Sequence, residues 1–153
     1  MPVNSELVGR EFPPTTPYLV GREKVREFSR AVFADAALHT DVEAARALGH
    51  ADVVAPPTFA MVIQDLTLQQ LLNEADSGIV LARTIHAEQR FAYTRPIVAG
   101  DELTAQLKVT GIRMMAGNAM ITSEAQISDA AGALVVTATS VLLVGSDDEE
   151  AAA

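Results

Sequence analysis

Two residues with acid/base side chains, Asp35 and His39, lie four positions apart shortly before an apolar stretch of the chain. A carboxylate and an imidazole that share a water molecule can exchange protons with a carbonyl compound. The apolar stretch begins after Pro56 and Pro57, and a proline has no backbone N–H to donate. The sequence therefore presents an acid/base pair but lacks, at this helix start, the anion-binding donor that completes many such sites.

Asp35 and His39 also have a purely structural interpretation, because residues four apart are neighbours on any helix and pair at its surface. No group of histidines and carboxylates has the spacing of metal ligands, and no glycine-rich phosphate loop is present. The absence of cysteine excludes thiol catalysis and disulfides. We therefore expect no metal and no cofactor, and any chemistry to use acid/base side chains alone.

The composition predicts a soluble globular protein. The chain has 153 residues, of which 49% are hydrophobic, and this is enough to bury a core in one domain. No apolar run reaches the roughly 18 residues that span a bilayer, and the N-terminus lacks the basic and apolar regions of a signal peptide. We therefore expect a cytoplasmic protein without membrane insertion.

The charge distribution argues against nucleic acid as a partner, because a net charge of −9 repels a polyanion. Part of the acidity lies in residues 146–153, which are predicted to be a disordered tail after a single domain of residues 1–145. Positive charge gathers on one predicted helix, in Arg22, Lys24, Arg26 and Arg30. This cluster is either a solvated helix face or a docking patch for an acidic carrier.

The first half of the chain shows helical periodicity in three segments. Residues 22–33 are amphipathic, and residues 42–48 form a shorter helix that ends at Gly49. Residues 58–73 are apolar on almost every side, which predicts a buried helix because a surface helix keeps a polar stripe. Thr58 is the expected N-cap of this third helix.

In the second half the period changes to two. Over residues 84–93 the alternation predicts a strand with Gln89 on one face and His86, Glu88 and Arg90 on an exposed polar face. Residues 102–115, 118–129 and 134–144 are predicted to continue as strands in an antiparallel meander.

The order of these elements, helices early and strands late, predicts an α+β protein. The apolar helix, of roughly 15 residues and about 22 Å, precedes four strands that are long enough to wrap it. The sequence therefore predicts a long buried helix within a curled antiparallel sheet.

This element order resembles the hot-dog fold of the MaoC-like hydratases and dehydratases from about Val8 to Val144. The residues that carry the resemblance are Asp35, His39, Asp41, the Gly49 turn, the apolar helix and residues 91–101, which contain Arg-Pro-x-x-x-Gly-Asp. Residues 20–28 and 55–59 add a closer likeness to the small, non-catalytic actinobacterial subunits of heterodimeric (3R)-hydroxyacyl-ACP dehydratase.

The resemblance implies roles for particular residues. Catalytic members hold water between an Asp and a His five positions apart, and a glycine amide at the start of the helix receives the thioester oxygen. Such a donor is needed because removal of the α-proton builds enolate charge. Asp35 and His39 fall on the motif's Asp and His, with a loop one residue shorter and without its Asn-Pro, and Pro57 falls on the glycine.

The resemblance implies a subunit of a (3R)-3-hydroxyacyl-thioester dehydratase or hydratase of fatty-acid metabolism, acting on acyl carrier protein or CoA thioesters beside a second hot-dog subunit. The subunit is expected to contribute the acyl-chain channel through Pro57, Phe59, Val62 and Ile63. Two alternatives stay open: a homodimeric (R)-specific enoyl-thioester hydratase in which Asp35 and His39 catalyse, and a non-catalytic module that binds an acyl thioester.

Overall fold

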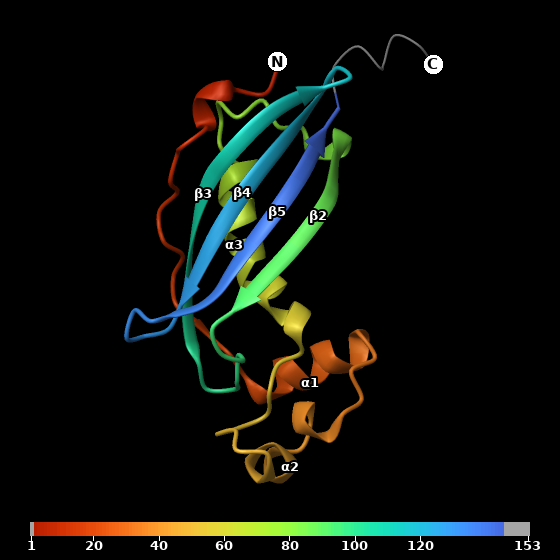
Figure 1. Cartoon of the computed structure of the whole chain (residues 1–153), viewed down its shortest axis with the longest axis vertical. Helices are drawn as coiled ribbons and strands as arrows, with labels where there is room; N and C mark the ends of the chain where they lie inside the picture. Colours follow the sequence, from red (N-terminus) through yellow and green to blue (C-terminus); the bar gives the residue numbers. More distant parts are fainter. Residues whose placement is uncertain (1, 146–153) are drawn as a thin grey trace.

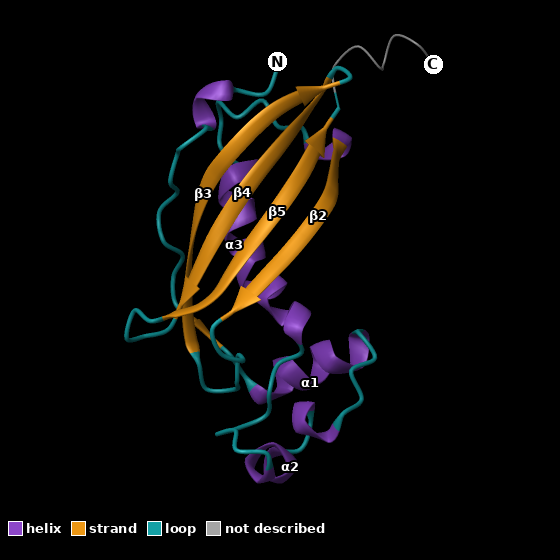
Figure 2. Cartoon of the chain, in the orientation of Figure 1, coloured by secondary structure: helices purple, strands orange, loops and turns teal. Residues whose placement is uncertain are grey.

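The computed structural model describes residues 2–145, which form a curled antiparallel sheet with a helix along its concave face (Figures 1 and 2). The strands lie in the order β1-β3-β4-β5-β2. They are β1 (Tyr18–Leu19), β2 (Thr84–Tyr93), β3 (Glu102–Met115), β4 (Asn118–Ser128) and β5 (Leu134–Val144). The predicted α+β class and curled antiparallel sheet are confirmed, whereas the short β1 was missed. The predicted acidic tail, residues 146–153, lies outside the described residues.

The α-helices are α1 (Arg22–Ala31), α2 (Val42–Ala47) and α3 (Ala60–Leu72). Four 3-10 turns accompany them: η1 (Ser5–Leu7), η2 (Ala37–His39), η3 (Pro57–Phe59) and η4 (Leu81–Arg83). Figure 1 shows α3 running behind the sheet, while α1 and α2 lie together beyond its lower end. The segment that carries Asp35 and His39 therefore lies outside the sheet, next to the start of α3.

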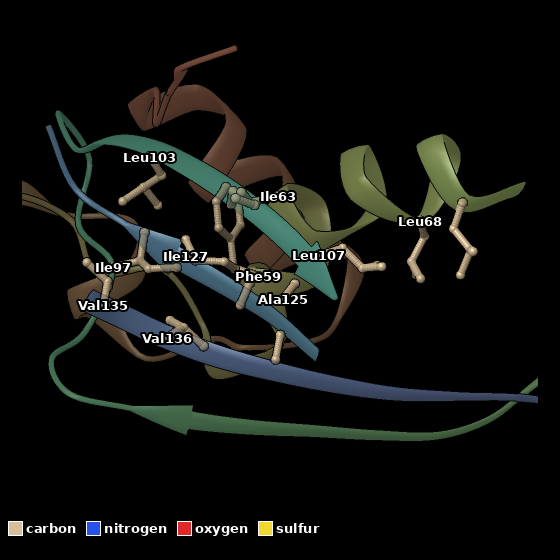
Figure 3. Close-up of a cluster of buried hydrophobic side chains, with 14 of the residues drawn as sticks. Phe59, Ile63, Leu68, Ile97, Leu103, Leu107, Ala125, Ile127, Val135 and Val136 are labelled. Carbon is tan, nitrogen blue, oxygen red and sulfur yellow. The ribbon is translucent and has the colours of Figure 1, made fainter. Parts of the chain in front are cut away.

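The core lies between α3 and the concave face of the sheet. Phe59, at the end of η3, and Ile63, on α3, have no exposed surface, and they meet strand side chains such as Leu107 and Ile127 (Figure 3). Because successive strand residues point to opposite faces, alternate residues of β3 and β4 enter this core. Each fully buried leucine or isoleucine contributes about 1.5–3 kcal/mol to stability.

The outer side of α3 is not buried in this chain. Asp65, Leu66 and Gln69 are exposed, and Met61 and Val62 are half-buried. The predicted buried helix is confirmed on the sheet side of α3, whereas its outer side is open to solvent in this chain. Only the sheet side of α3 is covered, so apolar residues on the other side remain accessible to solvent.

The start of α3 also differs from expectation. Thr58 is not an N-cap but lies inside η3, where the Phe59 N–H donates to the Pro56 carbonyl at 2.9 Å. No side-chain oxygen caps either η3 or α3. The difference arises because Pro57 fixes the φ angle of the first turn and lets the helical chain begin before Thr58.

A β-bulge in β2 corrects the predicted strand faces. The register shifts between His86 and Glu88, so that Ala87 has no partner on β5. His86 is opposite Leu142 and Gln89 is opposite Ser140, and both partners are buried on the concave face. His86 is exposed, as predicted, but it shares its face with Gln89 and not with Glu88. One extra residue reverses the alternation, and composition carries no signal for it.

Candidate functional site

His39 ends η2 with its ring in a defined orientation. Its Nδ1 lies 2.6 Å from the Val54 carbonyl oxygen, and the residue is half-buried. Because a carbonyl can only accept, Nδ1 carries the proton and the neutral ring keeps its lone pair on Nε2. The Nε2 atom can therefore accept a proton from a bound water or a substrate.

Asp35 is exposed in the loop before η2. Ala36 has an extended backbone, with φ −62° and ψ 135°, so Asp35 and His39 do not share a helix. Within residues 2–145, no hydrogen bond or ion pair joins the two side chains. The interpretation as a surface pair on a helix is therefore wrong, while their catalytic role stays a prediction.

A tyrosine that the sequence did not single out binds the start of the α3 segment, by which we mean η3 and α3 together, residues 57–72. The Tyr93 hydroxyl, from the last residue of β2, donates a hydrogen bond to the Pro57 carbonyl. Burial raises the pKa of Tyr93 to about 12, against the smaller opposing effect of the Ala60 N–H. This phenol therefore stays protonated at neutral pH. Tyr93 lies on the same strand face as Gln89 and Phe91, so the period-two pattern indicated that its side chain points toward the concave face. The pattern did not indicate which group the hydroxyl would bind.

The residues expected to line an acyl channel fall into two groups. Phe59 and Ile63 belong to the core, and the Phe59 ring meets Phe28 edge-on at 5.2 Å between centroids. Val62 is half-buried and Pro57 is exposed. A ligand at the surface of this chain could reach Pro57 and Val62 directly, whereas Phe59 and Ile63 would act through the packing beneath.

A cavity of about 360 Å³ runs between the start of the α3 segment and β2. Thr58 and Met61 line one side, and residues 86–89 with Phe91 line the other. The apolar lining residues are Met61, Ala87 and Phe91, and the polar ones are Thr58, His86, Glu88 and Gln89. The cavity follows the edge of β2, which has no strand partner other than β5 within the described sheet.

The basic residues of α1 are mostly neutralised by acidic neighbours. The Arg22 guanidinium makes a bidentate pair with Asp52, which holds the pKa of that carboxyl below its usual range. Arg26 pairs with Glu23. Lys24 lies 3.8 Å from a carboxylate oxygen of Glu27. The α1 face therefore supports the solvated interpretation and leaves little net positive charge for an acidic carrier.

The Arg-Pro-x-x-x-Gly-Asp segment has a structural role. The Arg95 guanidinium donates to both carboxylate oxygens of Asp101, at 2.8 and 3.1 Å, and to Asp129 at 3.3 Å. Asp101 also accepts the Val98 N–H. These bonds join the connection after β2 to the turn between β4 and β5, and Val98 of the same connection pairs with Val54, whose carbonyl holds His39.

No group of three or more histidine or carboxylate residues in the described part of the chain is placed to hold a metal ion. None of the helices within residues 2–145 is long and apolar enough to cross a membrane. His39 can thus supply a proton acceptor, and the cavity beside Thr58, Met61 and Phe91, which His39 does not line, supplies a partly apolar cleft. Pro57 does not supply a backbone donor for a developing oxyanion.

Comparisons with known proteins agree on one family. Residues 6–138 match the model of the FAS1-like dehydratase domain region. A UPF0336 protein of Clavibacter michiganensis subsp. michiganensis is 61% identical over 148 residues, which are 97% of this chain and 99% of that protein.

Among solved structures, the C-terminally truncated HadBC (3R-hydroxyacyl-ACP dehydratase) complex from Mycobacterium tuberculosis contains a similar chain. It has a TM-score of 0.82 and 30% identity, and the match covers 90% of this chain and 96% of that chain. A MaoC-like dehydratase has a TM-score of 0.83 and 38% identity, and the match covers 93% of this chain and 43% of the other. The hot-dog fold expected from the sequence is confirmed by these neighbours.

Proposed function

Because the chain belongs to the FAS1-like dehydratase family of MaoC-like hot-dog proteins, we propose that it is the acyl-channel subunit of a (3R)-3-hydroxyacyl-thioester dehydratase or hydratase. The similarity to a chain of the HadBC complex supports this reaction class. The thioester would be carried by acyl carrier protein or CoA, and the partner would be a second hot-dog subunit.

The observation that carries the subunit role is the closed start of the α3 segment. Pro57 has no N–H to donate, and the Tyr93 hydroxyl donates its proton to the Pro57 carbonyl and not into the site. An enolate formed here would lack a backbone donor at this position, and loss of one such donor costs about 10²–10³ in rate in other enzymes. A partner with an intact site would therefore carry most of the turnover.

The free edge of β2 supports a second subunit. β2 pairs only with β5 in the described sheet, so its outer backbone groups are available to another strand. The start of α3 lies beside the end of β2 (Figure 2), and on this helix Leu66 is exposed and Val62 is half-buried. A second hot-dog domain paired with β2 would extend the sheet, cover this surface and close the cavity.

One observation favours the alternative of a homodimeric hydratase. The Val54 carbonyl fixes the His39 tautomer so that Nε2 is free to accept a proton. Asp35 is exposed in the loop that leads to His39, and in this alternative its carboxylate would share a water with the His39 ring. In this alternative, His39 is the general base and a donor other than residue 57 stabilises the enolate.

The decisive experiment measures hydration of crotonyl thioester by the chain alone and after co-purification with a hot-dog partner that carries the complete Asp-x-Asn-Pro-x-His motif. Asp35→Asn and His39→Gln are then tested in the complex, with His50→Gln as a control histidine on the same part of the chain. Each of the three variants should reduce turnover by less than about tenfold.

Three results would change this conclusion. Activity of the chain alone, lost in His39→Gln, would establish the homodimeric enzyme in place of the subunit. Loss of activity in the assembled complex with Asp35→Asn or His39→Gln would likewise favour the homodimeric enzyme over the subunit. Binding of the thioester without turnover, with every partner tried, would leave only a binding module.

A further inference from the structure

A chain of three polar side chains crosses the space between β2 and α3. Gln64, on the inner side of α3, has no exposed surface. Its Oε1 accepts a hydrogen bond from Gln89 Nε2 at 2.7 Å, and its Nε2 donates to the Ala138 carbonyl at 3.4 Å. At the open end, His86 Nε2 lies 3.0 Å from Gln89 Oε1.

The direction of these hydrogen bonds fixes the tautomer of His86. Gln89 uses its amide N–H to reach Gln64, so its Oε1 faces His86 and can only accept. Nε2 of His86 therefore carries the proton. Nδ1 of the neutral ring keeps a lone pair, and it makes no hydrogen bond within the described residues.

The β-bulge at Ala87 is what delivers His86 to this chain. Without the extra residue, His86 would share the outer face with Glu88 and Arg90. Bulges at sheet edges and beside binding sites commonly redirect a side chain in this way. The bulge also places His86 on the wall of the 360 Å³ cavity, together with Gln89.

The cavity thus changes character along its length. Near Thr58 its walls include Met61 and Phe91, and farther along β2 they are formed by residues 86–89, which include the polar side chains of Gln89, Glu88 and His86. Gln64 lies six residues after Thr58, which is about 9 Å along a helix. A chain that enters at the start of the α3 segment therefore meets apolar contacts first and hydrogen-bonding groups afterwards.

We propose that this cavity selects acyl chains that carry a hydroxyl group near their far end, with His86 Nδ1 as the acceptor of the hydroxyl proton. An unsubstituted alkyl chain of the same length would displace water from His86 and Gln89 without replacing its hydrogen bonds, so it would bind more weakly. The inference rests on the proposed acyl-channel function and takes this cavity, which Thr58 and Met61 line next to Pro57 and Val62 in the chain, as the continuation of that channel.

The test compares two probes of equal length, octanoyl-pantetheine and 8-hydroxyoctanoyl-pantetheine, by calorimetric titration of the full chain in its assembled complex. The hydroxylated probe should bind about tenfold more tightly. The preference should disappear in His86→Phe and in the double variant Gln64→Met with Gln89→Met. The double variant removes both partners of a buried hydrogen bond, which is better tolerated than removal of one.

Gln69→Met is the matched control, because Gln69 lies on the exposed side of the same helix. It should leave the tenfold preference unchanged. Equal binding of the two probes by the unmodified chain, or an unchanged preference in both His86→Phe and the double variant, would overturn the proposal. If octanoyl-pantetheine binds more tightly while the complex still hydrates crotonyl thioester at its normal rate, this inference alone is overturned. If neither probe binds and the complex does not hydrate crotonyl thioester, the proposed function is overturned as well.

Discussion

The closed start of the α3 segment can be tested directly through the ionisation of Tyr93. The chain has two tyrosines and no tryptophan, so Tyr18→Phe leaves Tyr93 as the only phenol. Burial raises the pKa of Tyr93 from 10.0 to about 12. At about pH 11 an unperturbed tyrosine is roughly 90% ionised, whereas Tyr93 should be roughly 10% ionised.

The measurement is the ultraviolet absorbance of tyrosinate against pH, with circular dichroism recorded on the same samples to show that the fold persists. A midpoint near 12, well separated from that of the unfolded chain, is expected. The reciprocal variant Tyr93→Phe should titrate only Tyr18, whose pKa is also raised, by burial and then by the charge of Glu27.

The same shift has a consequence for stability. A folded-state pKa above the unfolded value means that the folded chain holds the phenol proton more tightly. The contribution of Tyr93 is therefore complete below about pH 10 and is lost as the pH rises toward 12. Because the ring is partly exposed, the loss should not exceed about 2 kcal/mol. A Tyr93 midpoint near 10 in the folded protein would refute a closed helix start.

Three further outcomes follow from the fold. Light scattering of the purified chain should show no stable monomer, because the β2 edge is unpaired in the described sheet; a folded monomer independent of concentration would contradict this. Val62→Phe should disfavour long acyl thioesters in the complex and spare short ones, whereas equal loss at all lengths would indicate destabilisation. Arg95→Leu should lower the free energy of unfolding by about 2 kcal/mol in denaturant titrations, since Asp101 and Asp129 lose charge-assisted bonds; a change below about 0.5 kcal/mol would contradict the structural role.

The periodicity of the apolar residues predicted the helices and the long strands because each of these elements buries one face and exposes the other. The strand expected over residues 102–115 is β3, with the same limits, and the helix expected over residues 42–48 is α2, which ends at Ala47 with Leu48 as its C-cap and Gly49, at positive φ, after it. The outer side of α3 was misjudged for a related reason. Leu66 and Val62 carry the apolar pattern of a buried residue, but a pattern does not say which surface does the burying.

The site was less predictable, because its contacts join residues far apart in the chain. The missing N–H at position 57 follows from the covalent structure of proline alone. The hydrogen bond from the Tyr93 hydroxyl to the Pro57 carbonyl joins residues 36 positions apart, and no local pattern indicates it. Gln64 was visible as a polar residue within an apolar helix, and a buried amide requires a partner. That partner, Gln89, lies on the inner face in either register, but His86 joins them only through the bulge. The polarity of the cavity is therefore set by a single unpaired residue of β2, which no local pattern in the sequence distinguishes from its neighbours.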